Sequence, residues 1–186
     1  MLRHFFIYFC KMNIPVNTVA NKNIITLDIT TWIPKEEDIF QLDLKSFLYK
    51  ELILKEADYK EALQNYNWDL LQGKVVRVYC SNMAIIPTWA YMLLCPYLQK
   101  VSTFFSFAST KEQFTHLFLL HTIDMLPLAT YQNQRVVIKG CGDKSINENI
   151  YMQLSTKLLP VVRSIAYGEP CSMVPIYKNN IDKKTN

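Results

Sequence analysis

Residues 74–80 read Lys-Val-Val-Arg-Val-Tyr-Cys, and the β-branched residues in this run predict a β-strand. A helix is predicted after Pro87, which suits a first helical turn, with Trp89 and Met92 on one face. The next predicted strand covers 101–107. Strand and helix therefore alternate, which is the order expected when parallel strands are joined by crossover helices.

The alternation continues toward the C-terminus. Two serines, Ser109 and Ser145, are each followed three residues later by a glutamate, and this capping-box spacing predicts a helix after each serine. Strands are predicted at 135–139 and 160–167, where valine and isoleucine are frequent. The second half of the chain thus predicts a parallel sheet covered by helices.

Upstream, residues 23–28 and 40–44 predict two short strands, and apolar residues spaced by three and four over 44–66 predict one or two helices. We therefore expect an α/β fold. Its predicted form is a three-layer α/β/α arrangement with a mostly parallel sheet, plus short N-terminal strands and helices. No internal repeat is evident in the sequence.

Length and composition favour a single globular domain. The chain has 186 residues, of which 50% are hydrophobic and 19% charged, with a formal net charge of +4. We predict one domain at 13–178, a non-native or disordered extension at 1–12 and a polar tail at 179–186. The modest, dispersed charge argues against nucleic-acid binding, and no apolar stretch is long enough to span a membrane. A cytoplasmic location is expected.

Three of the five cysteines follow predicted strands: Cys80, Cys141 and Cys171. If these strands are parallel in one sheet, the three thiols gather at one edge, where ligands usually bind. Converging thiolates need a cation, so the sequence predicts a cysteine cluster that binds zinc, iron or an iron–sulfur cluster, with Asp143 as an oxygen ligand. Cys95 is predicted to pack in a helix.

Two other interpretations remain open. Cys141 precedes a predicted helix N-terminus, which favours a thiolate, so the chain could be an enzyme with one activated cysteine and a small substrate. In the third interpretation the cysteines are inert and the chain is a non-catalytic binding or scaffold module. His116 and His121 are five residues apart and do not form a helical metal-binding pair, and no nucleotide-binding glycine motif is present.

Several sequence blocks resemble the uncharacterised bacterial domain-of-unknown-function family 2480, from about Asn13 to Lys178. The blocks are Cys80-Ser81, Pro87 with Trp89-Ala90-Tyr91-Met92, Val136-Val137-Ile138-Lys139-Gly140-Cys141 and Tyr167-Gly168-Glu169-Pro170-Cys171-Ser172. The family has no assigned activity. Its genes lie near sulfur-mobilisation and iron–sulfur assembly genes, so the resemblance implies an accessory factor in that metabolism, with iron–sulfur assembly proteins as partners and Cys80, Cys141 and Cys171 as site residues.

Overall fold

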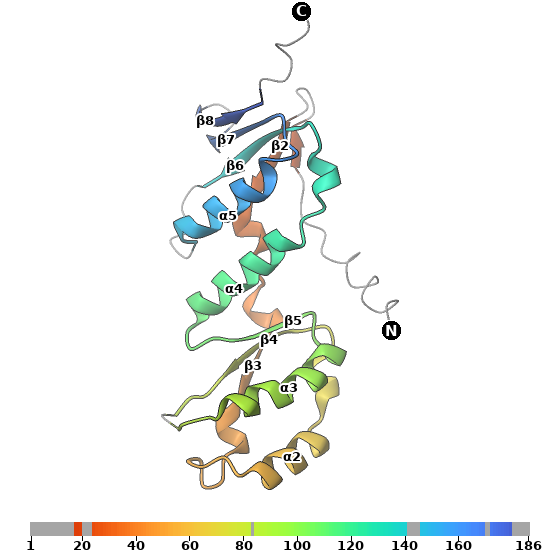
Figure 1. Ribbon diagram of the computed structural model, residues 1–186, viewed down its shortest axis with the longest axis vertical. Helices are drawn as coiled ribbons and strands as arrows, with labels where there is room; N and C mark the ends of the chain where they lie inside the picture. Colours follow the sequence, from red (N-terminus) through yellow and green to blue (C-terminus); the bar gives the residue numbers. More distant parts are fainter. Residues whose placement is uncertain (1–16, 20–23, 83, 141–145, 170–171, 180–186) are drawn as a thin grey trace, which may run out of the picture. The chain divides into compact units, whose positions relative to one another are not determined.

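A computed structural model gives the fold of the chain (Figure 1). It describes residues 17–19, 24–82, 84–140, 146–169 and 172–179. The contacts within the chain divide it into two units, which we describe separately. Unit 2 is the continuous segment Pro34–Leu117, and unit 1 comprises the segments before and after it.

Unit 1 contains a five-stranded sheet in the order β1-β2-β6-β7-β8. The central pairs β2–β6 and β6–β7 are parallel, whereas the outer strands β1 and β8 pair antiparallel to their neighbours. The strands are β1 Asn17–Val19, β2 Ile24–Asp28, β6 Arg135–Lys139, β7 Ser164–Glu169 and β8 Ser172–Lys178. This sheet is therefore mostly parallel at its centre.

The core of unit 1 joins this sheet to two long helices. These are α4 (Lys111–Asp124), whose C-terminal part belongs to unit 1, and α5 (Glu148–Leu158). Short 3-10 helices η1 (Ile29–Trp32) and η5 (Leu128–Tyr131) also contribute buried side chains to this core. No helix in the described ranges is long and apolar enough to cross a membrane.

Unit 2 contains a separate, wholly parallel sheet in the order β3-β4-β5. Its strands are β3 Ile39–Asp43, β4 Val75–Tyr79 and β5 Phe104–Phe107. Helices α2 (Glu56–Asn65) and α3 (Thr88–Val101) share one buried core with these strands, and the 3-10 helices η2 Glu36–Asp38, η3 Leu44–Phe47 and η4 Trp68–Leu71 lie in the connections.

The two units have the same internal construction. In unit 2 the Gly73 N–H donates to the Val101 carbonyl at 2.7 Å, and in unit 1 the Asn133 N–H donates to the Val161 carbonyl at 2.7 Å. Both donors have positive φ, 73° for Gly73 and 57° for Asn133. Gly73 and Asn133 are separated by the same number of residues as Val101 and Val161. The turn before β4 is therefore repeated before β6.

The buried residues repeat with the same offset. The counterparts in the two cores are Leu63 and Ile123, Leu71 and Tyr131, Val76 and Val136, Val78 and Ile138, Ala90 and Ile150, Leu94 and Leu154, and Leu98 and Leu158. The first strands also correspond, because Asp28 and Asp43 each end a strand and accept a hydrogen bond from the backbone N–H two residues later. Unit 2 is thus a second copy of the module, inserted in sequence between β2 and the remainder of unit 1.

The α/β class and the mostly parallel sheet predicted from the sequence are confirmed. The strands form two sheets, however, where the cysteine hypothesis needed one, and the prediction of no internal repeat is wrong. The physical reason is that each module has its own first strand: β2 pairs with β6, and β3 pairs with β4. The local strand and helix pattern does not determine which strands pair, because adjacency in sequence favours pairing without requiring it. The boundaries predicted for one domain at 13–178 stay a prediction.

Candidate functional site

The carboxyl ends of β6 and β7 are joined by side-chain contacts. Because these neighbouring strands are parallel, their ends lie at the same edge of the sheet. The Lys139 ammonium lies 3.2 Å from the Glu169 carboxylate. The Tyr167 hydroxyl donates a hydrogen bond to the Gly140 carbonyl at 3.2 Å. These contacts hold the two chain exits next to each other.

Two glycines allow this close approach. A Cβ atom at Gly140 would overlap the ring of Tyr167, so only glycine fits beside that ring in its present position. Gly168 has a φ of 119°, and a Cβ there would lie 2.7 Å from the Ser172 carbonyl oxygen of the adjoining strand. The Tyr167 ring also packs edge-on against Tyr151. The edge is thus fixed by packing on both sides of Tyr167.

The predicted ligands of unit 1 come directly after these two exits. Cys141 and Asp143 follow β6, and Cys171 follows β7. All three lie outside the described residues. Within the described part of the chain, no group of three histidine, cysteine, aspartate or glutamate side chains is arranged to hold a metal ion.

Cys80 lies in the other unit, at the end of β4. Its thiol is half-buried and donates to the Asn82 side-chain oxygen at 3.0 Å. The expectation that one sheet edge gathers Cys80 with Cys141 and Cys171 is therefore wrong, because β4 pairs with β3 and β5 and never with β6 or β7. Of the three strands that precede these cysteines, only β6 and β7 are paired with each other, and they precede Cys141 and Cys171.

Asp43 is the polar group that orders the chain after β4. Its carboxylate accepts hydrogen bonds from the backbone N–H groups of Ser81 and Lys45, both at 3.0 Å. Burial would raise the pKa of this carboxyl, but the hydrogen bonds from Ser81 and Lys45 outweigh it and lower the pKa. Asp43 thus remains a carboxylate that fixes the loop carrying Ser81.

The remaining sequence candidates are not drawn into a site. Cys95 is exposed on α3, with its thiol 3.6 Å from the Tyr91 carbonyl, so the prediction that it packs in the protein is wrong. The helix places Leu94 and Leu98 inward and leaves Cys95 on the opposite face. His116 and His121 are half-buried on α4.

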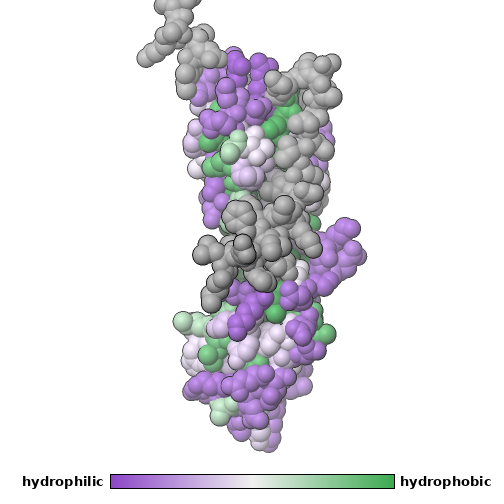
Figure 2. All heavy atoms as spheres, turned by 90° about the vertical axis from the view of Figure 1, so that its right-hand side faces the viewer, coloured by the Kyte–Doolittle hydropathy of each residue, from purple (hydrophilic) through white to green (hydrophobic). Residues whose placement is uncertain are grey.

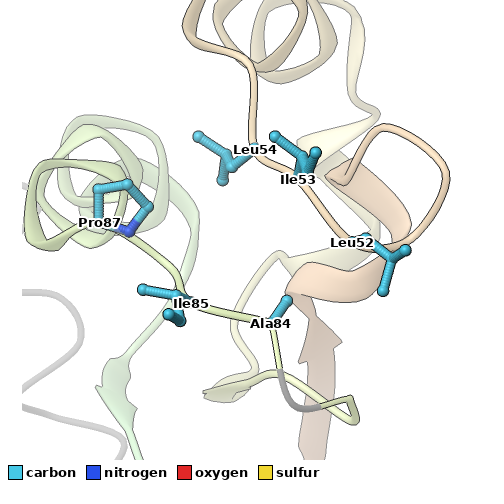
Figure 3. Close-up of a pocket in the computed structure, with 6 residues that line it drawn as sticks. All are labelled: Leu52, Ile53, Leu54, Ala84, Ile85 and Pro87. Carbon is cyan, nitrogen blue, oxygen red and sulfur yellow. The ribbon is translucent and has the colours of Figure 1, made fainter.

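Unit 2 also contains an apolar cleft that sequence reasoning missed. It has a volume of about 540 Å³ and lies between two chain segments, with Leu52, Ile53 and Leu54 on one side and Ala84, Ile85 and Pro87 on the other (Figure 3). Ile85 is 91% exposed. Figure 2 shows the face on the right-hand side of Figure 1. The lower part of that face is mostly hydrophilic, with scattered hydrophobic side chains. The signal in the sequence was the run Leu52-Ile53-Leu54 between charged residues, which helical periodicity over 44–66 obscured.

Fold and edge geometry define an α/β protein made of two similar parallel-sheet modules, with candidate site residues at the carboxyl edges of the strands. The chain belongs to the DUF2480 family, described as proteins of unknown function, whose model matches residues 13–179. The resemblance stated from the sequence blocks is thereby confirmed. Comparisons with curated proteins and with solved structures gave no match.

Proposed function

We propose that the protein is an accessory factor of iron–sulfur or sulfur metabolism that binds a metal ion or sulfur at the carboxyl edge of unit 1. The ligands are Cys141 and Cys171, with Asp143 or an external group completing the site. Zinc and iron both accept two thiolates together with oxygen ligands. Cys80, which the sequence hypothesis included, is left out because its strand belongs to the other sheet.

One observation carries the proposal, namely the tie between the ends of β6 and β7. Lys139 and Glu169 form an ion pair at 3.2 Å, and each precedes a cysteine by two residues. Because the ends of β6 and β7 are neighbours, only short segments have to be ordered for the two thiols to reach a common ion. The loss of conformational entropy is therefore small. The ammonium of Lys139 would also favour deprotonation of a nearby thiol.

The test is anaerobic purification of the full chain, followed by analysis of bound metal and acid-labile sulfide. We expect bound zinc, iron or sulfide in the wild type and its loss in both Cys141→Ser and Cys171→Ser. Cys95→Ser is the matched control, because this thiol is exposed on a helix and outside the site. Cys80→Ser is expected to retain the metal.

Two outcomes contradict the proposal. The first is a wild-type protein that contains neither metal nor sulfide after anaerobic purification and that takes up no added zinc or iron(II). The second is retention of the metal in Cys141→Ser or Cys171→Ser while circular dichroism shows that both variants are folded.

A further inference from the structure

The apolar cleft belongs to a feature that only one copy of the module has. In unit 1 the chain leaves η1 at Ile33 and passes directly to unit 2. In unit 2 the corresponding turn, η3, is followed by a small hairpin in which Tyr49 and Ile53 exchange backbone hydrogen bonds of 2.8 and 3.2 Å. The hairpin is thus an addition to the shared module and needs an explanation of its own.

The hairpin turn holds apolar side chains in solvent at a conformational cost. Lys50 and Glu51 have φ values of 49° and 59°, in the left-handed region that non-glycine residues rarely adopt. Leu52 is 67% exposed and Ile53 61% exposed, although both are aliphatic. A strained turn next to exposed apolar side chains is typical of a binding surface.

Asn82 joins the two walls of the cleft. Its side-chain amide nitrogen donates to the Glu51 carbonyl of the hairpin. Its side-chain oxygen accepts from the Ala84 N–H of the opposite wall at 3.1 Å. The Lys45 ammonium holds the Glu51 carboxylate at 2.9 Å and further anchors the hairpin. Because one residue bridges both walls, the cleft is present before any ligand arrives, which lowers the entropy cost of binding.

The hairpin and the residues that follow it carry mostly paired charges, with Lys50 as the exception among the described residues. The exposed ring of Tyr49 has the Lys55 ammonium 3.4 Å from its centroid and the Lys50 ammonium at 5.5 Å. Lys55 also reaches the Asp58 carboxylate, at 4.0 Å. Lys50 forms no ion pair with a carboxylate among the described residues, so its charge is available to a ligand.

We propose that this cleft is a docking site for a partner protein, which inserts an apolar peptide segment that carries an adjacent carboxylate. The two aliphatic walls bury the apolar side chains, and Lys50 pairs with the carboxylate. Lys50 favours this occupant over an uncharged lipid chain, because only a ligand with a carboxylate can pair with its ammonium.

The experiment selects peptides from a random displayed library on the full-length protein and measures the affinity of the synthetic winners by fluorescence anisotropy. We expect the selected peptides to combine large apolar residues with aspartate or glutamate. Leu52→Asp should weaken their binding roughly tenfold or more, because it replaces an aliphatic side chain of one wall with a carboxylate that also repels an acidic peptide. Lys50→Glu should weaken it several-fold and reduce its dependence on salt.

Met152→Asp is the matched control, since Met152 is also 67% exposed but lies on α5 of unit 1. Peptides that bind Leu52→Asp as tightly as the wild type would overturn the proposal, as would winners without carboxylates or a selection that yields no binder. Sedimentation equilibrium provides the remaining test: a wild-type dimer that Leu52→Asp dissociates would assign the cleft to a second copy of the chain.

Discussion

The two units share a core and differ at the carboxyl edges of their strands. In unit 1, Gly140 follows β6 and lies against the Tyr167 ring. In unit 2 the corresponding position is Cys80, whose thiol donates a hydrogen bond to the Asn82 side chain beside the apolar cleft. The same core packing is thus compatible with two different sets of residues at the carboxyl ends of the strands. The buried residues maintain the fold, and the residues that follow the strands are the ones that differ between the units. Function should be sought where the copies differ.

The largest expected effects test whether the two cores are equivalent. Leu94 and Leu154 are counterparts with 1% and 0% exposure. Replacing either one with alanine leaves a cavity, and we expect each substitution to lower the free energy of unfolding by about 2–5 kcal/mol. Urea denaturation followed by circular dichroism measures both changes.

Counterparts at the surface provide the control for that pair. Met92 and Met152 are both 67% exposed on equivalent helices, and alanine at either position should change the free energy of unfolding by less than about 0.5 kcal/mol. A cost at Leu94 alone, with Leu154→Ala as stable as the wild type, would break the equivalence of the cores.

A smaller effect is expected where the edges differ. Gly140→Ala forces a Cβ atom against the Tyr167 ring and should cost about 1–3 kcal/mol through overpacking. Cys80→Ala, at the corresponding position of unit 2, adds no Cβ atom, because cysteine already has one. It removes only the Sγ atom and its hydrogen bond to Asn82 and should therefore cost less. Thermal unfolding of Gly140→Ala with and without Tyr167→Ala sharpens the comparison, because the costs should not add. Additive costs would show that the ring is not the obstacle.

The sequence predicted the elements of the fold better than their arrangement. The strand predicted at 135–139 matches β6, and the strand predicted at 74–80 contains β4. The partners of these strands were not predictable, because pairing depends on contacts distant in sequence. The repeat left only faint traces, such as the Leu-Asp pairs that end β2 and β3. A core position requires an apolar side chain but not a particular one, as the counterparts Ala90 and Ile150 show.

The candidate sites were predicted less completely. The ion pair between Lys139 and Glu169 joins the ends of β6 and β7. The predicted ligands Cys141 and Cys171 lie outside the described residues and stay a prediction. The cleft was missed because residues 44–66 were assigned to helices, whereas α2 begins only at Glu56. Apolar residues with helical spacing do not reveal a hairpin that depends on two left-handed residues, Lys50 and Glu51.

The smallest expected effect concerns the repeated turn. Gly73 and Asn133 both adopt positive φ and both donate to a valine carbonyl. Glycine and asparagine are the residues that tolerate this conformation best, so the double exchange Gly73→Asn with Asn133→Gly should change the free energy of unfolding by less than about 1 kcal/mol. Alanine has no such tolerance, and Gly73→Ala and Asn133→Ala should each cost more than the exchange when measured by urea denaturation. If alanine were tolerated at one turn and not at the other, the two turns would not be the same structural element, and the correspondence between the units would rest on their cores alone.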